Sequence, residues 1–203
     1  METGPTFREE HALRDGTKIV LRHIQPADAP ELRRGFLALS PESRYRRFFG
    51  AITDLDDAAL AYLTNVDGKD HVAIVATTES LDLKEERGIG VARFIRSEKD
   101  PAAAEAAITV VDDMQQKGVG TLLARALARA ARERGIDRFR CEVLQSNDAV
   151  VRALCEVGAK DVERSDGTLV LDVPVPVENE SIVRRTLRLA AEHVNPFLRR
   201  LLP

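Results

Sequence analysis

Tryptophan is absent from the 203 residues, and aromatic side chains make up only 4% of them. This scarcity argues against the stacked aromatic surfaces that bind single-stranded nucleic acid. Neither sign of charge dominates: 30 Lys and Arg residues stand against 33 Asp and Glu residues, which gives a net charge of −3. No overall positive field would therefore attract nucleic acid or an anionic membrane. We expect no nucleic-acid partner.

Cysteine is also scarce, because the chain has only two, too few for a disulfide scaffold. We expect Cys141 and Cys155 to be buried structural thiols, since each lies in an apolar segment. The four histidines are far apart in the sequence and form no ligand pattern, so we expect no metal site. No apolar run reaches the roughly 18 residues needed to cross a bilayer, and the first residues do not resemble a signal peptide. A cytoplasmic protein is expected.

The chain is organised as one α/β domain between two appendages. Residues 1–17 are expected to form a polar N-terminal arm, residues 18–173 the domain, and residues 174–203 a linker followed by an amphipathic helical tail. The tail would dock on the domain or form the seam of a homodimer, and a membrane surface is the less favoured partner. Within the domain, hydrophobic patterning predicts a mixed sheet flanked by helices. The expected strands are 18–24, 71–78, 88–95, 105–111, 139–144, 160–163 and 168–173, and the longest expected helix is 118–134.

The most informative segment is the one in which an apolar strand turns through a short loop into this long helix. The first N–H groups of a helix have no partners inside it and carry the positive end of its dipole, so they can bind phosphate. Glycines at 118 and 120 would let an anion approach, Lys117 would add a charge and Thr121 a hydroxyl group. Taken alone, the glycines are better explained by a simple turn into a helix. The spacing fits neither the Walker loop nor the dinucleotide-binding fingerprint.

The spacing does match Gln-x-x-Gly-x-Gly, formed here by Gln115, Gly118 and Gly120. In this context it resembles the acyl-CoA pyrophosphate loop of the GNAT acetyltransferase superfamily. Segments such as 39–49, 89–94 and 105–108 are most similar to the acetyltransferase domain of bacterial Pat-type protein lysine acetyltransferases. The resemblance implies a GNAT fold, acetyl-CoA as co-substrate and a set of acyl-CoA-binding residues. These are Val110, Val111, Asp112, Gln115, Gln116, Lys117, Gly118, Val119, Gly120, Thr121 and Asn147. Without the resemblance, a helix N-cap is the simpler interpretation of Asn147.

Acetyl transfer to an amine needs a group that accepts the proton of the amine, because a free lysine has a pKa of about 10.4. Glu105 is the best candidate, since it begins an otherwise apolar strand just before the loop and burial would raise its pKa. The resemblance assigns the general base to this position, although a solvent-facing carboxylate at a strand end is the simpler interpretation. The tyrosine that many GNAT enzymes use to protonate the leaving thiolate is replaced by Leu154, so water would have to supply that proton.

Three functions remain open at this stage. The first is acetylation of a protein lysine with acetyl-CoA, by direct attack and with Glu105 as base. The second keeps this chemistry with a small amine as the acceptor, and the third is an acyl-CoA-binding sensor without turnover. The basic and aromatic segment around Arg44, Tyr45 and Arg47 could read acidic residues beside a substrate lysine, which favours a protein acceptor, or could simply be a charged helix face.

Overall fold

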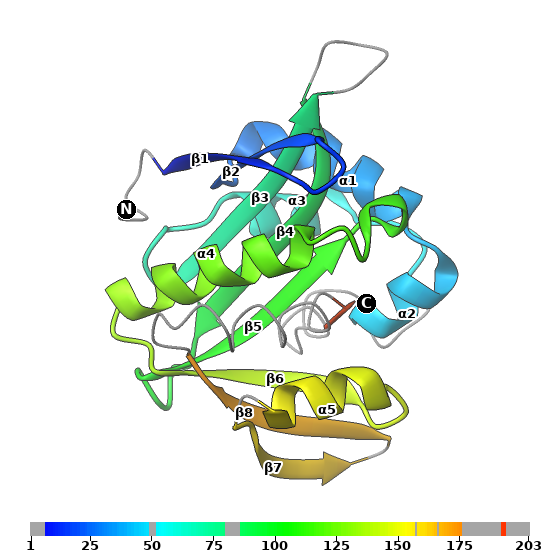
Figure 1. Ribbon diagram of the computed structural model, residues 1–203. Helices are drawn as coiled ribbons and strands as arrows, with labels where there is room; N and C mark the ends of the chain where they lie inside the picture. Colours follow the sequence, from blue (N-terminus) through cyan, green and yellow to red (C-terminus); the bar gives the residue numbers. More distant parts are fainter. Residues whose placement is uncertain are drawn as a thin grey trace.

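The computed structural model describes residues 7–48, 52–79, 86–156, 158–165, 167–175 and 192–193 (Figure 1). Its centre is a mixed sheet with the strand order β1-β2-β3-β4-β5-β6-β8-β7, and β9 also pairs with β5. The strands are β1 Arg8–Ala12, β2 Lys18–His23, β3 His71–Glu79, β4 Glu86–Arg96, β5 Ala103–Val110, β6 Arg138–Leu144, β7 Lys160–Ser165, β8 Thr168–Pro174 and β9 Glu192–His193. The expected α/β class with a mixed sheet is confirmed.

Five α-helices and two short 3₁₀ turns cover the sheet among the described residues. They are η1 Pro26–Asp28, α1 Ala29–Ala38, α2 Pro41–Phe48, α3 Asp57–Thr64, η2 Asp112–Met114, α4 Val119–Glu133 and α5 Asp148–Glu156. Two of these helices begin with a side-chain cap: Ser40 Oγ accepts the backbone N–H of Ser43, and the Asp56 carboxylate accepts that of Ala59. Gly135, with φ at +72°, follows the end of α4 in the left-handed conformation that commonly terminates a helix.

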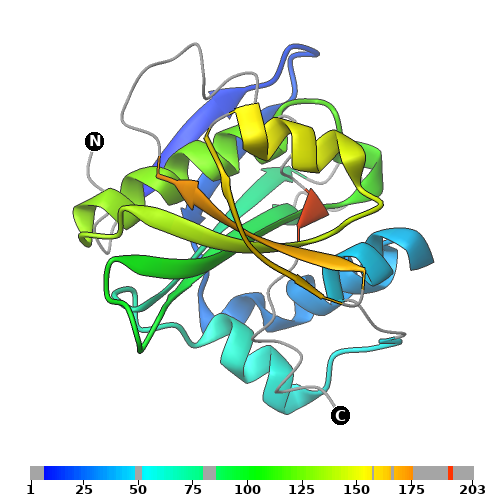
Figure 2. The ribbon, with the colours of Figure 1, turned by 90° about the horizontal axis from the view of Figure 1, so that it is seen from below.

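The helices divide between the two faces of the sheet, as Figure 2 shows: α4 and α5 lie on one face and α1 and α3 on the other. Strand residues alternate between these faces. Ala92 and Phe94 of β4 join Leu123 and Leu127 of α4 in the largest apolar core. Arg93, between Ala92 and Phe94, points to the opposite face, where it donates a hydrogen bond to the carbonyl of Leu63 in α3.

One pairing in the sheet determines the position of the site. All neighbouring strands are antiparallel except β5 and β6, which are parallel and pair only over Ala103–Glu105 and Arg138–Arg140. Beyond Glu105 the edge of β5 no longer pairs with β6, and Ile108 and Thr109 pair instead with β9. The end of β5 is therefore separated from the end of β6 where the chain enters the glycine-containing loop.

Three features differ from the expectations. The arm expected over 1–17 contains strand β1, which sequence patterning did not predict because Arg8–Ala12 is almost entirely polar. β1 pairs with β2, and its Glu9 lies 2.8 Å from Arg129 of α4. The expected helical tail lies largely outside the described residues, and within it Glu192–His193 form strand β9.

Cys155 is the third difference, because it is exposed rather than buried. Helix α5 turns Leu154 toward the core, and the next residue along a helix faces about 100° away, so Cys155 faces solvent. Cys141 behaves more nearly as expected: burial raises the pKa of its thiol to about 12, which makes it an inert side chain at neutral pH.

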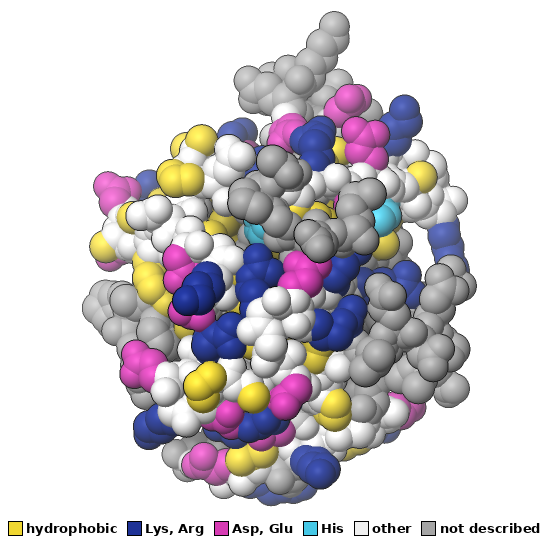
Figure 3. Space-filling model, turned by 90° about the vertical axis from the view of Figure 1, so that its left-hand side faces the viewer, with side chains coloured by type: hydrophobic (Ala, Val, Ile, Leu, Met, Phe, Trp, Pro, Cys, Tyr) yellow, Lys and Arg dark blue, Asp and Glu magenta, His cyan; other side chains and the backbone are white. Residues whose placement is uncertain are grey.

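Charged side chains of both signs are distributed over the surface. On the face shown in Figure 3, basic side chains gather near the middle and acidic ones lie among and around them. Among the described residues, no helix is long and apolar enough to cross a membrane.

Gly90 of β4 provides a test of how closely α4 packs on the sheet. A Cβ atom there would lie 2.9 Å from the carbonyl oxygen of Thr109 and 3.0 Å from Leu123 Cδ1. Because the Thr109 atom is backbone, it cannot rotate away. We expect Gly90→Ala to lower the free energy of unfolding by about 1–3 kcal/mol in urea denaturation.

The matched control is Gly35→Ala in α1, where the nearest atom to the new Cβ would be Val111 Cγ1 at 4.0 Å. This variant should be as stable as the wild type or more stable, by up to about 1 kcal/mol, because alanine favours the helix. Equal stability of Gly90→Ala and the wild type would contradict the close approach of α4 to β4.

Candidate functional site

The site begins where the chain leaves β5 and turns into α4. Val110 ends the strand, η2 forms one tight turn, and α4 starts at Val119. Gln116 and Gly118 both adopt left-handed backbone conformations, with φ at +60° and +101°. A glycine takes this conformation without strain, which explains Gly118, whereas a glutamine adopts it only where the surrounding structure holds it there.

Gln115 closes the loop from within. Its side-chain Nε2 donates to the carbonyl of Val110 at 3.2 Å and to Asp112 Oδ1 at 3.0 Å. The first residue of the Gln-x-x-Gly-x-Gly pattern therefore joins the two ends of the turn. Its role in this structure is to fix the path of the backbone.

Asp112 ties the same loop to α2. Its carboxylate accepts hydrogen bonds from the Ser40 backbone N–H at 2.8 Å and from Ser43 Oγ at 2.7 Å. Partial burial acts to raise the pKa of Asp112, but the hydrogen bonds from Ser43 and Ser40 outweigh it and lower the pKa below its usual value. The start of α2, 72 residues earlier, is thus held against the loop by an ionised carboxylate.

The N-terminus of α4 has the features of an anion site. Its N-cap, Gly118, offers no side-chain cap, and the first turn carries no acidic residue. The backbone N–H groups of Val119, Gly120 and Thr121 therefore keep their capacity to bind a ligand. Lys117, half-exposed, lies beside them with its Nζ 3.9 Å from Asp15 Oδ2.

Asn147 lies after β6, the strand whose pairing with β5 ends at Glu105. It precedes α5, and its backbone carbonyl accepts the N–H groups of Val150 and Val151. It therefore occupies the N-cap position, one of its two expected roles, with its side chain partly exposed. Leu154, at the position of the missing tyrosine, is buried in the core.

Glu105 lies on the sheet face that α1 and α3 cover. The strand register aligns it in one row across the sheet with His71, Ile95 and Arg140. The residue is partly buried, and its Oε2 atom is shielded from solvent. The carboxylate is therefore on the same side of β5 as Thr109, in the first half of the strand and four residues before Thr109.

Three further polar residues, Tyr62, His71 and Arg93, lie on this side of the sheet. Sequence patterning did not identify them as a cluster. The ring of Tyr62 in α3 lies 5.1 Å from that of His71, and His71 Nε2 lies 3.0 Å from Arg93 Nη1. Because arginine can only donate, Nε2 of His71 is the acceptor and its proton is on Nδ1. The one signal in the sequence is an arginine within the apolar run Val91-Ala92-Arg93-Phe94-Ile95.

Burial sets the protonation states of this cluster. It raises the pKa of Tyr62 to about 12, and the negative charge of Glu105 acts in the same direction. Burial and the neighbouring Arg93 lower the pKa of His71 to about 4. Burial lowers the pKa of Arg93 to about 10. At neutral pH the tyrosine is therefore protonated, the histidine neutral and the arginine charged.

A metal centre has no support in the described part of the chain. No three His, Cys, Asp or Glu side chains there are grouped closely enough to hold an ion.

Comparison with known proteins identifies the family of the chain. The model of the acetyltransferase (GNAT) domain family matches residues 18–160. The chain is 35% identical over 164 residues to the acetyltransferase Pat of Mycolicibacterium smegmatis. The aligned residues cover 81% of this chain and 48% of that protein. The chain thus spans about half the length of this relative. It is also 29% identical over 148 residues to the acetyltransferase PA5475 of Pseudomonas aeruginosa, over 72% of this chain and 77% of that one.

Solved structures give the same result. The GNAT domain of S. lividans PAT superposes with a TM-score of 0.71 at 30% identity, over 82% of this chain and 96% of that one. The cAMP-binding acyltransferase from Mycobacterium smegmatis matches with a TM-score of 0.56 at 30% identity, over 91% of this chain and 55% of that one. A family model that covers most of the chain, together with these relatives, shows that the chain belongs to the GNAT acetyltransferase family.

Proposed function

We propose that this protein is an acetyl-CoA-dependent N-acetyltransferase that transfers the acetyl group to a lysine side chain of a protein, with Glu105 as the general base. The observation that carries the proposal is the placement of Glu105. Its half-buried carboxylate lies on β5, the strand that leads directly into the loop and the uncapped N-terminus of α4.

Acyl-CoA would be held by groups that the fold already places in order. The N–H groups at the start of α4 and the charge of Lys117 suit the pyrophosphate. The backbone of Val110, Val111 and Asp112 would accompany the pantetheine arm on one side, and Asn147 would approach it on the other. Gln115 and Asp112 hold the loop in shape before any ligand binds, which reduces the ordering cost of binding.

The transfer itself requires one proton acceptor. The neutral amine attacks the thioester carbonyl, the carbon–sulfur bond breaks, and the proton of the amine passes to the carboxylate of Glu105, directly or through water. The thiolate takes its proton from water, because Leu154 supplies none. Its own pKa, near 8.5 for a thiol, makes this departure feasible.

The protonation states around Glu105 support its assignment. Tyr62, with a pKa of about 12, and Arg93, with a pKa of about 10, both hold their protons at neutral pH. His71 is neutral, but its acceptor nitrogen is engaged by Arg93. Of these four groups, the carboxylate is the one that can take up a proton from an amine.

A protein acceptor is supported by the similarity to the Pat-type proteins and by helix α2. Arg44 lies with its guanidinium 5.7 Å from the ring of Phe36, and Tyr45 beside it is exposed. A basic helix beside the loop would favour a lysine with acidic neighbours on a folded protein.

The decisive experiment compares the wild type with Glu105→Gln, using Glu163→Gln on the exposed strand β7 as the matched control. Acetyl-CoA binding is measured by calorimetry, and transfer by release of free CoA thiol with lysine-rich proteins as acceptors. Loss of a general base should reduce turnover by about 10²–10⁴-fold and leave acetyl-CoA affinity unchanged. The control should match the wild type.

The alternative outcomes are distinct. Full turnover by Glu105→Gln would remove Glu105 from the reaction. Mass spectrometry of the products separates acetylated protein lysine from an acetylated small amine. Binding of acetyl-CoA by the wild type without turnover on any acceptor would indicate a sensor module.

Lys117 tests the pyrophosphate site separately from the chemistry. Its side chain is 43% exposed, so Lys117→Glu should fold normally while placing a negative charge beside the start of α4. We expect at least a tenfold loss of acetyl-CoA affinity by calorimetry, which corresponds to about 1.4 kcal/mol. Lys69→Glu, at an exposed turn before β3, should bind as the wild type does; equal affinity of both variants would argue against the assigned phosphate site.

Asp112 tests whether the loop is organised in advance. Asp112→Ala removes the acceptor for Ser40, Ser43 and Gln115, and should lower the free energy of unfolding by about 1–3 kcal/mol at pH 7. The pKa of Asp112 is lowered in the folded state, so its contribution is present above its usual value of 3.8 and is lost as the pH falls through the folded-state pKa. The wild type should therefore lose its advantage over the variant below about pH 4.

The neighbouring Asp113→Ala is the control. Asp113 makes an exposed ion pair with Arg87, and such pairs contribute about 1 kcal/mol or less. Equal destabilisation by the two substitutions would show that Asp112 does not hold the loop.

A further inference from the structure

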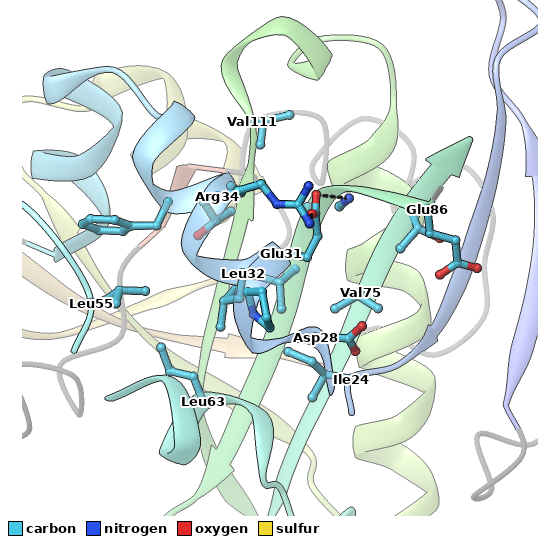
Figure 4. A pocket seen from close by; sticks show the side chains of 18 of the residues that line it. Ile24, Asp28, Glu31, Leu32, Arg34, Leu55, Leu63, Val75, Glu86 and Val111 are labelled. Atoms are coloured by element: carbon cyan, nitrogen blue, oxygen red, sulfur yellow. Dashed lines mark hydrogen bonds and ion pairs between the residues drawn. The ribbon is translucent and has the colours of Figure 1, made fainter. Parts of the chain in front are cut away.

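A cavity of about 370 Å³ lies between helix α1 and the sheet face that carries Arg93 (Figure 4). Its size is at the lower end of the range for small-molecule sites. One side is formed by Thr109 and Val111, the residues with which β5 ends and the loop begins. Most of the rest is apolar: Ile24, Leu32, Phe36, Leu39, Leu55, Leu63, Val75 and Val91.

The acidic groups that line the cavity are already paired. Asp28 and Glu86 both lie within 2.9 Å of Arg22. Glu31 pairs with Arg34 at 2.7 Å and accepts the backbone N–H of Gly88, as the dashed contacts of Figure 4 indicate. These carboxylates are therefore neutralised at the positions where they stand.

Arg93 is the exception among the lining charges. Its side chain is 2% exposed, and its partners are the carbonyl of Leu63 and the ring of His71, both uncharged. The Nε atom is buried and has no hydrogen-bond partner, and no carboxylate among the described residues lies within ion-pair distance of the guanidinium. A buried cation without a counter-ion is costly, and such charges are normally paired.

A second buried polar atom without a partner lies at the other end of the same wall. Thr77 is 3% exposed, lines the cavity, and its Oγ1 makes no hydrogen bond. Arg93 pairs with Ala73 of β3, four residues before Thr77, so the two side chains are separated by about 13 Å along the strands. The cavity thus has an apolar middle, with a cation at one end and a hydroxyl at the other.

We propose that this cavity binds an apolar ligand bearing a carboxylate, with the carboxylate paired to Arg93. The ligand could be a free carboxylic acid, or the far end of an acyl chain carried by CoA. The second source is within reach because Arg93 is two residues from Val91, which pairs with Thr109, a distance of about 7 Å along the strand.

The first test needs no substitution. Hexanoate and hexanamide have the same apolar chain, but only hexanoate is charged, and both are titrated into the full chain by calorimetry. Charge-assisted pairing should make hexanoate bind at least tenfold more tightly. Equal affinity for hexanoate and hexanamide would overturn the proposal. So would a failure of the protein to bind both hexanoate and a carboxylate-bearing acyl-CoA.

The second test assigns the preference to Arg93. Arg93→Met keeps an unbranched, largely apolar side chain and removes the charge, and it should abolish the preference for hexanoate. Because the charge lacks a counter-ion, this variant should be as thermally stable as the ligand-free wild type, or more so. Arg33→Met removes an exposed arginine that pairs with Asp54 outside the cavity, and it should keep the preference.

Thr77→Val is a second variant, which should fold even if Arg93→Met fails to fold. It removes only the unpartnered hydroxyl, so the preference of hexanoate over hexanamide should remain. Loss of the preference in Thr77→Val would place the carboxylate away from Arg93 and contradict the assignment.

The two sources are separated by succinyl-CoA and butyryl-CoA, whose chains differ in the terminal carboxylate. If the acyl chain is the ligand, succinyl-CoA should bind at least tenfold more tightly than butyryl-CoA in the wild type, and equally in Arg93→Met. If a free acid is the ligand, the wild type should bind hexanoate more tightly than hexanamide, but it should bind succinyl-CoA and butyryl-CoA with equal affinity. Since the hexanoate titration involves no transfer, it can succeed or fail independently of the proposed acetyltransferase activity.

Discussion

The early end of the parallel pairing between β5 and β6 is the constraint on which the site depends. After three residue pairs the strands separate, so the backbone edge of β5 beyond Glu105 is no longer satisfied by β6. The separation leaves Val110 free to lead into the loop and lets α4 begin beside the strand end, while α5 begins beyond β6.

The loop and the helix that follow β5 could be predicted from the sequence because their determinants are local. Gly118 needs a left-handed backbone, Gln115 reaches back only five residues to Val110, and the apolar stripe of α4 follows directly. Such short-range requirements leave a pattern in the chain. The strand containing Glu105 was predictable for the same reason, because its alanines and β-branched residues are continuous and buried.

The features that the sequence did not reveal depend on contacts between distant segments. Strand β1 is almost entirely polar, and it becomes a strand through pairing with β2 and the contact between Glu9 and Arg129, 120 residues away. The sequence shows Asp112 only as a carboxylate in a loop, because its hydrogen bonds to Ser40 and Ser43 depend on the position of α2. Cys155 was misjudged because apolar neighbours in the sequence do not say which way one position of a helix faces.

The two faces of the sheet contribute differently to the free energy of folding. The face toward α4 is dry and closely packed, with Phe94, Leu123 and Leu127 fully buried and Gly90 allowing the helix to approach. The opposite face holds Glu105, Tyr62, His71 and Arg93, groups whose burial costs free energy. Strand alternation makes this division possible, because each residue of β4 and β5 that packs against α4 is followed by one that faces α1 and α3. Packing on the face toward α4 stabilises the fold enough to offset the cost of an unpaired charge on the other face. Arg93 can therefore be retained for binding a ligand although it does not stabilise the fold.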